Sequence, residues 1–173
     1  EELILLFQKG DEAGFNILVS RYKDPLTNFV YRFLGERDEC NDVVQETFVR
    51  MFRNRESYKP VAKFSTWIYT VATNAAKSHL RKRKLWRRFA VGGSEDAPEP
   101  EFDIPDASAS PDDRVHALML EERIQKALDT LALKYKEIIL LRDVQELSYE
   151  EIAVITGLNV GTVKSRINRA RGQ

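Results

Sequence analysis

The fold of the C-terminal part of the chain is decided by the segment LSYEEIAVITGLNVGTVKSRINRAR, residues 147–171. Ser148 and Glu151 have the spacing of a capping box, in which each side chain satisfies an unpaired backbone donor of the other residue. Gly157 then allows a sharp turn, and Asn159 or a neighbour caps a second helix. Apolar residues recur at helical spacing on one face of each helix: Ile152 and Ile155, then Val163, Ile167 and Ala170. This pattern predicts a helix-turn-helix.

The outward face of the second predicted helix is polar and basic. It carries Lys164, Ser165, Asn168 and Arg169, with Arg166 and Arg171 nearby. A helix in the major groove needs Arg or Lys for guanine edges, Asn for adenine, and Ser or Arg for phosphates. A helical hairpin whose basic face is only solvated is the alternative. The capping box, the small Ala153 four residues before Gly157, and the turn at Gly157 share one register, and this favours DNA binding.

The charges are unevenly distributed, although the formal net charge of the 173 residues is zero. Residues 1–90 have a net charge of +6, residues 91–122 of −9, and residues 123–173 of +3. Two basic parts therefore flank an acidic middle, and this distribution says more about binding partners than the total does. The zero total is no argument against a nucleic-acid binder.

The segment 91–111 has the composition of a linker. It contains Gly92, Gly93 and four of the six prolines, together with several acidic residues. Because proline removes backbone donors and little apolar surface is available for burial, we predict a flexible acidic linker. No stretch shows sustained alternation with β-branched enrichment. The predicted fold class is all-α, with two small helical domains at 1–90 and 112–173.

Two long helices are predicted on either side of this linker. The first runs from about 63 to 88, with Phe64 and Trp67 expected in the core. The helix ends with the segment KSHLRKRKLWRR (77–88), which has seven basic side chains and no acidic one. The basic side chains on its other face can follow a phosphate backbone. The second helix begins with a capping Ser, Pro in its first turn, and acids near the positive end of its dipole. That start is Ser110-Pro111-Asp112-Asp113, and an apolar stripe follows at Leu120, Ile124, Leu128 and Leu131.

Composition excludes several classes of function. The longest apolar run, residues 3–7, has five residues, far below the about 20 that cross a membrane. A single cysteine, Cys40, allows no internal disulfide and favours a reducing, cytoplasmic location. Neither Cys40 nor His79 has a second ligand nearby, so we expect packing roles for both and no metal or cofactor. No nucleophile motif or glycine-rich phosphate loop is present, so we predict no catalytic residues and no small-molecule substrate.

Three blocks resemble the extracytoplasmic-function (ECF) sigma factors, the smallest members of the bacterial sigma-70 family. The blocks are DVVQETFVRMF (42–52), KFSTWIYTVATNAAKSHLRKRK (63–84) and LSYEEIAVITGLNVGTVKSRINRAR (147–171). They occur in the order of the family and span nearly the whole chain. The resemblance implies two helical domains, regions 2 and 4, that bind core RNA polymerase and recognise the −10 and −35 promoter elements.

The resemblance also implies three groups of site residues. Residues similar to the motif that docks on the clamp helices of the largest polymerase subunit are Asp42, Val43, Val44, Gln45, Glu46, Phe48, Val49 and Phe52. Residues at positions that capture the −10 strand, where a flipped base exposes edges that duplex DNA hides, are Tyr58, Lys63, Asn74, Lys77, Arg81 and Lys84. Residues at positions that contact the −35 duplex are Arg142, Thr162, Lys164, Ser165, Arg166, Asn168, Arg169 and Arg171. From its neighbours Lys59 and Pro60, Tyr58 is a better candidate for an exposed contact than Phe64 or Trp67.

We therefore predict a promoter-specificity subunit of bacterial RNA polymerase that is not an enzyme. Its expected partners are core polymerase, promoter DNA and an anti-sigma factor, membrane-anchored or not. One alternative is a helix-turn-helix regulator that binds operators without polymerase, but residues 42–55 favour the sigma factor. Another is a sigma mimic that sequesters an anti-sigma factor. Such a mimic would have lost its DNA-facing cations, whereas Lys77, Arg81 and Lys164 are present.

Overall fold

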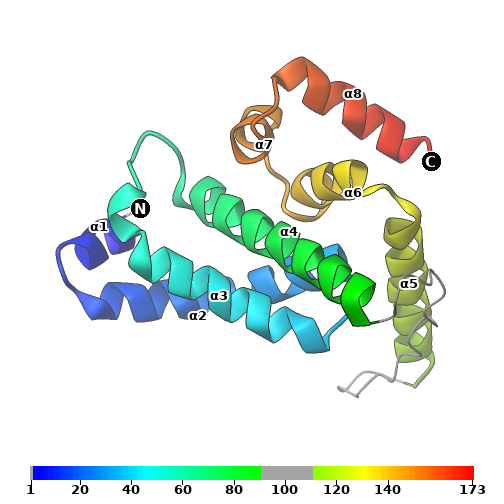
Figure 1. Cartoon of the computed structure of the whole chain (residues 1–173), viewed down its shortest axis with the longest axis horizontal. Helices are drawn as coiled ribbons and strands as arrows, with labels where there is room; N and C mark the ends of the chain where they lie inside the picture. The colour runs from blue at the N-terminus through cyan, green and yellow to red at the C-terminus, as the bar shows by residue number, and fades with distance from the viewer. Residues whose placement is uncertain (1, 91–110) are drawn as a thin grey trace.

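The computed structural model describes residues 2–90 and 111–173, and every element in these two ranges is helical (Figure 1). The N-terminal part consists of α1 (Glu2–Gln8), α2 (Glu12–Leu34), α3 (Asp38–Arg53), the 3-10 turn η1 (Arg55–Ser57) and α4 (Phe64–Ala90). The C-terminal part consists of α5 (Pro111–Thr130), α6 (Leu133–Ile139), the π turn η2 (Leu140–Val144), α7 (Tyr149–Thr156) and α8 (Val160–Arg171). The predicted all-α fold in two helical parts is confirmed. The predicted linker and the capping Ser110 lie outside the described residues.

The core of the N-terminal part forms where α2, α3 and α4 pack together. Its fully buried side chains include Leu26 and Phe29 of α2, Met51 of α3 and Ile68 of α4. Burying a side chain of this size stabilises the fold by about 1.5–3 kcal/mol. The ring of Phe29 meets the ring of Tyr69 edge-on, with 5.3 Å between the centroids, a geometry that aromatic pairs prefer. These contacts hold α4 against the other two helices.

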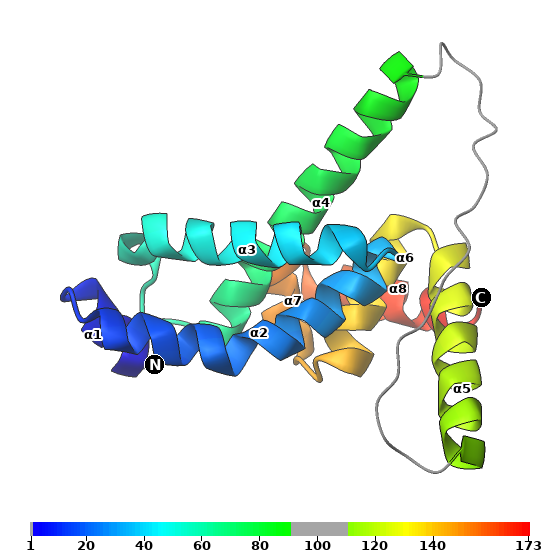
Figure 2. The ribbon, with the colours of Figure 1, turned by 90° about the horizontal axis from the view of Figure 1, so that it is seen from below.

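The helix α2 has clear end signals that explain the antiparallel return of α3. The side chain of Asp11 accepts a hydrogen bond from the amide of Ala13 at 2.9 Å and so caps the start of α2. Gly35 ends the helix with φ at +81°, a left-handed conformation that glycine adopts without strain. A short connection then places α3 antiparallel beside α2 (Figure 2).

The predicted helix-turn-helix is confirmed. The side chain of Ser148 accepts from the amide of Glu151 at 3.1 Å, and the amide of Ser148 donates to the Glu151 carboxylate at 2.8 Å. Gly157 has φ at +69° and ends α7, and the side chain of Asn159 accepts from the amide of Thr162 at 2.8 Å to start α8. The predicted apolar edges are buried as expected: Ile152 and Ile155 in α7, and Val163, Ile167 and Ala170 in α8.

The apolar stripe predicted on α5 is buried only at its C-terminal end. Leu128 is buried and Leu131 is half-buried, whereas Leu120 and Ile124 are 57% and 40% exposed. The reason is the position of α5 at the side of the molecule, where its last turns approach the N-terminal part (Figure 1). There the side chain of Gln125 donates to the carbonyl oxygen of Arg32 at 3.4 Å. None of the helices in the described ranges is long and apolar enough to cross a membrane.

Candidate nucleic-acid and protein interfaces

The helix α8 presents a polar, basic face to solvent. The side chains of this face that the sequence predicts to contact DNA are exposed: Lys164, Ser165, Asn168 and Arg169. Two other predicted residues of the helix, Thr162 and Arg166, are half-buried. The helices α6 and α7 lie between α8 and α4, so α8 forms an outer edge of the molecule (Figure 1). The orientation of this face is fixed, because Asn159 caps the start of α8 and Val163 and Ile167 are buried on the opposite side of the helix.

Two further predicted DNA contacts flank this face, and both are held by neighbouring groups. The guanidinium of Arg142 in η2 donates to the carbonyl oxygen of Leu147 at 2.8 Å. The guanidinium of Arg171 lies 2.5 Å from the carboxylate of Asp143, and this hydrogen bond raises the pKa of Arg171. The structure thus brings cations of η2 and α8 together at one end of the helix-turn-helix.

The C-terminal half of α4 projects beyond the α2–α3 pair (Figure 2) and carries exposed cations. Arg81 and Lys84 are exposed, and Asn74, nearer the start of the helix, is exposed as well. Trp86 is also 73% exposed at the projecting end. Exposed cations and an exposed aromatic ring on one helix are suited to a phosphate backbone with accessible bases.

The expectation that Tyr58 is exposed is wrong. Only 3% of the residue is accessible, and its hydroxyl donates to the carbonyl oxygen of Ala62 at 3.1 Å. Its ring packs edge-on against the rings of Phe64 and Trp67, with 5.9 and 5.6 Å between the centroids. Phe64 is buried as predicted, and Trp67 is half-buried. The neighbouring Lys and Pro suggested an exposed loop, but the loop folds back on α4 and turns the ring inward.

Glu151 of the C-terminal part contacts the start of α4. The carboxylate of Glu151 lies 3.1 Å from the ammonium of Lys63 and accepts from the hydroxyl of Thr66 at 3.3 Å. Burial would raise the pKa of Glu151, but hydrogen bonds from Ser148 and Lys63 outweigh it and lower the pKa. One predicted −10 contact, Lys63, is therefore already paired with a carboxylate.

A second group of contacts covers the middle of α4. The ammonium of Lys77 lies 2.6 Å from the carboxylate of Glu137, and the side chain of Glu137 is only 6% exposed. The hydroxyl of Tyr69 donates to the side chain of Gln145 in the same region. Burial raises the pKa of Tyr69 to about 12, so this hydroxyl keeps its proton. A DNA strand that contacts Lys63 and Lys77 has to displace both carboxylates.

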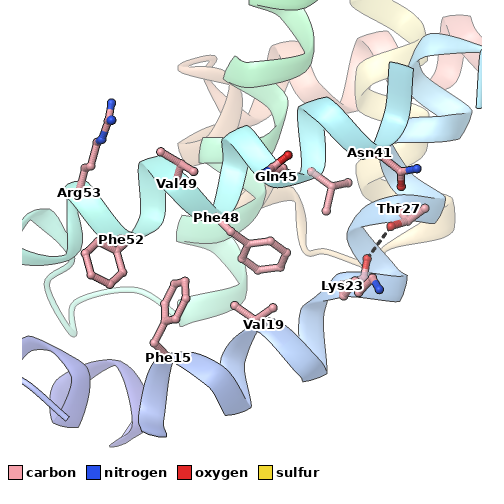
Figure 3. Close-up of a pocket in the computed structure, with 11 residues that line it drawn as sticks. Phe15, Val19, Lys23, Thr27, Asn41, Gln45, Phe48, Val49, Phe52 and Arg53 are labelled. Atoms are coloured by element: carbon pink, nitrogen blue, oxygen red, sulfur yellow. Dashed lines mark hydrogen bonds between the residues drawn. The ribbon is translucent and has the colours of Figure 1, made fainter. Parts of the chain in front are cut away.

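A groove of about 540 Å³ lies between α2 and α3 on the other side of the N-terminal part. Figure 3 shows Phe48 and Phe52 of α3 facing Phe15 and Val19 of α2 across it. The rings of Phe15 and Phe52 meet edge-on with 5.3 Å between the centroids. The full lining is Phe15, Val19, Lys23, Thr27, Asn41, Val44, Gln45, Phe48, Val49, Phe52 and Arg53. The floor is apolar and the rim is polar, as in a site for an apolar helix face.

The structure divides the predicted polymerase contacts between two sides of α3. Val44, Gln45, Phe48, Val49 and Phe52 line this groove. The remaining three are Asp42, Val43 and Glu46, which line a smaller hollow of about 210 Å³ shared with α4. Val43, Val44 and Phe48 are buried, so the apolar surface that this motif offers to a partner comes mainly from Val49 and Phe52. The α2 residues of the groove were missed, because their proximity to α3 depends on helix packing that no local pattern reports.

Cys40 and His79 have the packing roles predicted for them. Cys40 is buried, its thiol donates to the carbonyl oxygen of Glu36 at 2.9 Å, and burial raises its pKa to about 11. His79 is half-buried, with its Nε2 2.8 Å from the carboxylate of Glu39. Across residues 2–90 and 111–173, no group of His, Cys, Asp and Glu side chains is arranged to hold a metal ion.

Two family models match the chain at the two helical parts. The model for sigma-70 region 2 matches residues 18–85, and the model for sigma-70 region 4 matches residues 121–173. The fold and the helix-turn-helix thus define a protein built from sigma-70 regions.

Curated relatives narrow the class further. The ECF RNA polymerase sigma factor SigW of Bacillus subtilis is 38% identical over 166 residues, which cover 95% of this chain and 88% of SigW. The ECF RNA polymerase sigma-E factor of Escherichia coli is 36% identical over 173 residues, covering 98% of this chain and 88% of that protein. The chain belongs to the ECF sigma factors of the sigma-70 family, as its sequence predicts. It is a specificity factor of transcription initiation rather than an enzyme.

Two solved structures are similar to this chain over most of its length. CnrH in complex with the cytosolic domain of CnrY has a TM-score of 0.70 and 25% identity, and the match covers 98% of this chain and 90% of CnrH. The sigma factor RpoE of Bartonella quintana in complex with the anti-sigma factor NepR has the same TM-score and identity, covering 91% of this chain and 92% of RpoE. Both neighbours are bound to a partner in these structures.

Proposed function

We propose that α8 recognises the −35 duplex and that the exposed face of α4 captures the −10 strand. The observation that carries this assignment is the exposed, basic face of α8 on a capped helix-turn-helix of a sigma-70 family member. Lys164 and Arg169 are free of acidic partners among the described salt bridges and point outward, so they can meet base edges and phosphates. Asn74, Arg81 and Lys84 supply the polar and cationic groups for a single strand.

The groove between α2 and α3 is proposed as the docking site for core polymerase. Its apolar floor at Phe48 and Phe52, with the polar rim residues Gln45 and Arg53, suits a helical partner such as the clamp helices of the largest subunit. The residues on the opposite side of α3, Asp42 and Glu46, would contact that partner less directly.

Control by an anti-sigma factor is part of the same proposal. The neighbour RpoE of Bartonella quintana is bound to an anti-sigma factor, and this chain shares its fold over 91% of its length. Since core polymerase is the proposed partner, we propose a cytoplasmic location. We also propose domain bounds at 1–90 and 112–173, with 91–111 as the connection.

Reconstituted transcription tests the proposal. The chain is mixed with core polymerase of Bacillus subtilis, whose SigW is the 38% identical relative, and run-off transcripts from a genomic DNA library are sequenced. We expect transcripts whose start sites share two upstream elements separated by a fixed spacing. The Lys164→Ala variant is expected to initiate less at these sites and to tolerate −35 mutations that inhibit the wild type. Random start sites, or an unchanged profile of −35 mutations, would contradict the assignment of α8.

A further inference from the structure

Tyr149, the first residue of α7, lies against two of the cations proposed to contact the −35 duplex. The guanidinium carbon of Arg142 is 4.9 Å from the centroid of its ring, and the ammonium of Lys164 is 5.5 Å from the same centroid. Both distances are within the about 6 Å over which a ring attracts a cation. No local sequence pattern indicates a role for Tyr149, because the two cations come from η2 and α8 and only the fold brings them to its ring.

Two cations beside one ring repel each other, so their positions require an interaction that offsets this repulsion. The negative face of the ring offsets part of this repulsion, and an anionic ligand would offset the rest. Arg142 and Lys164 have flexible side chains, of which Arg142 is also held by the carbonyl oxygen of Leu147 at 2.8 Å. Lys164 is exposed and makes no side-chain hydrogen bond or ion pair within residues 2–90 and 111–173. Its contact with the ring of Tyr149 is therefore what restrains it there.

The ring itself is firmly placed. Tyr149 is half-buried and packs against the hydrophobic core. It follows Ser148, whose capping box fixes the backbone at the start of α7. The third nearby cation, Arg171, is held in a different way, through its hydrogen bond to Asp143 at 2.5 Å. Each of these cations beside the helix-turn-helix therefore has its own restraint.

We propose that Tyr149 is a positioning residue for promoter recognition, and that its ring holds Arg142 and Lys164 in place for the −35 duplex. The DNA then meets cations that are already ordered, and binding loses less conformational freedom. This inference rests on the proposed function of α8.

The chain offers a matched control for the ring. Tyr135 in α6 is also half-buried, and the ammonium of Lys134 lies 5.0 Å from its ring centroid. Neither residue belongs to the proposed −35 surface. Removing this second ring changes the same kind of contact at a place where DNA is not expected.

The experiment measures binding of the holoenzyme, formed with Bacillus subtilis core polymerase, to duplexes selected from a random-sequence pool by the wild type. Tyr149→Leu is expected to weaken binding of the selected duplexes by about fivefold or more, the effect of losing two such contacts. Tyr149→Phe and Tyr149→Trp keep a ring and are expected to stay within about twofold of the wild type. Tyr135→Leu is expected to bind like the wild type.

A double-mutant comparison separates positioning from general destabilisation. In a chain that already carries Arg142→Ala and Lys164→Ala, adding Tyr149→Leu is expected to cause no further loss of affinity. A second measurement does not require the Leu variant to fold. The Cε protons of Lys164 are expected to show an upfield ring-current shift in the wild type and in Tyr149→Phe.

The outcomes separate this inference from the proposed function. If the wild-type holoenzyme enriches no sequence, the assignment of α8 is wrong and the inference falls with it. If enrichment occurs but Tyr149→Leu binds as the wild type does, only the positioning role is overturned. The same holds if Tyr149→Phe loses as much as Tyr149→Leu, if the loss persists without the two cations, or if the Lys164 protons show no ring-current shift.

Discussion

The Glu151 carboxylate accepts hydrogen bonds from both parts of the chain. One oxygen accepts from the amide of Ser148 at 2.8 Å and completes the capping box, while the other lies 3.1 Å from Lys63. These donors lower the pKa of Glu151 below 4.5, its ordinary value, despite the opposing effect of burial. A depressed pKa stabilises the folded state above pH 4.5, and this stabilisation is lost as the pH falls through the lower folded value. The helix start and the contact with α4 therefore persist together at neutral pH.

Asn74 provides the most direct test of strand capture at the scale of one residue. Its exposed amide can donate a hydrogen bond to the edge of a flipped base and accept one from it. Such a pair of hydrogen bonds contributes about 1–3 kcal/mol. Asn74→Ala is therefore expected to reduce open complexes about tenfold while closed complexes largely remain. Permanganate reactivity of the opened strand measures the open complexes, and filter binding at low temperature measures the closed ones.

The matched control for Asn74 is Asn16, an exposed asparagine on α2. Asn16→Ala removes the same amide from a surface with no proposed contact to DNA and is expected to leave both complexes unchanged. Surface substitutions of this kind usually change stability by no more than about 0.5 kcal/mol, so neither variant should unfold. Equal loss of open and closed complexes in Asn74→Ala would contradict strand capture.

At the scale of the element, the α2–α3 groove can be tested with a single charge. Val49 is half-buried on its wall, so an aspartate there stays hydrated in the free protein but is desolvated when an apolar helix docks. Val49→Asp is expected to weaken core polymerase binding by about tenfold or more. Titration of labelled chain with core polymerase, followed by fluorescence anisotropy, measures the effect.

Val154 is the control for this substitution, because it is a valine on an exposed helix surface, 64% accessible, outside the groove. Val154→Asp is expected to bind core polymerase like the wild type. Circular dichroism spectra of both variants should match that of the wild type. If Val49→Asp binds core polymerase normally, the docking site is elsewhere.

Elements defined by local signals could be predicted from the sequence, and elements defined by packing could not. The start of α7 and the exposed face of α8 follow from contacts within a few residues, such as the capping box at Ser148. The inward turn of Tyr58 depends on a ring cluster with Trp67 and on the path of one loop. The pairing of Lys63 and Lys77 with acids of the C-terminal part joins residues far apart in sequence, as does the groove shared by α2 and α3. Periodicity carries no information about such long-range pairs.

At the scale of the whole molecule, the two basic parts meet through carboxylates that occupy the proposed DNA face of α4. Glu137 and Glu151 stand beside Lys77 and Lys63, where phosphates of the −10 strand are expected. The same cations cannot serve both partners at once. Acids of the C-terminal part thus cover part of this face. If the −10 strand also contacts Lys63 and Lys77, as proposed, these two ion pairs have to open first.

Glu137→Gln is expected to weaken the closed arrangement, because it replaces the charged partner of Lys77 with a neutral amide at an interface where Glu137 is almost fully buried. Since Lys77 remains 31% exposed and solvent screens the pair, we expect a loss of about 1 kcal/mol of closure rather than the larger cost of a fully buried pair. Small-angle X-ray scattering of the free chain should show a larger radius of gyration. A single-stranded oligonucleotide carrying the −10 element should also bind more tightly. Glu122→Gln is the control, because it breaks a Glu–Lys contact of the same 2.6 Å length within α5 and should change neither quantity. An unchanged radius and affinity in Glu137→Gln would show that this pair does not hold the parts together.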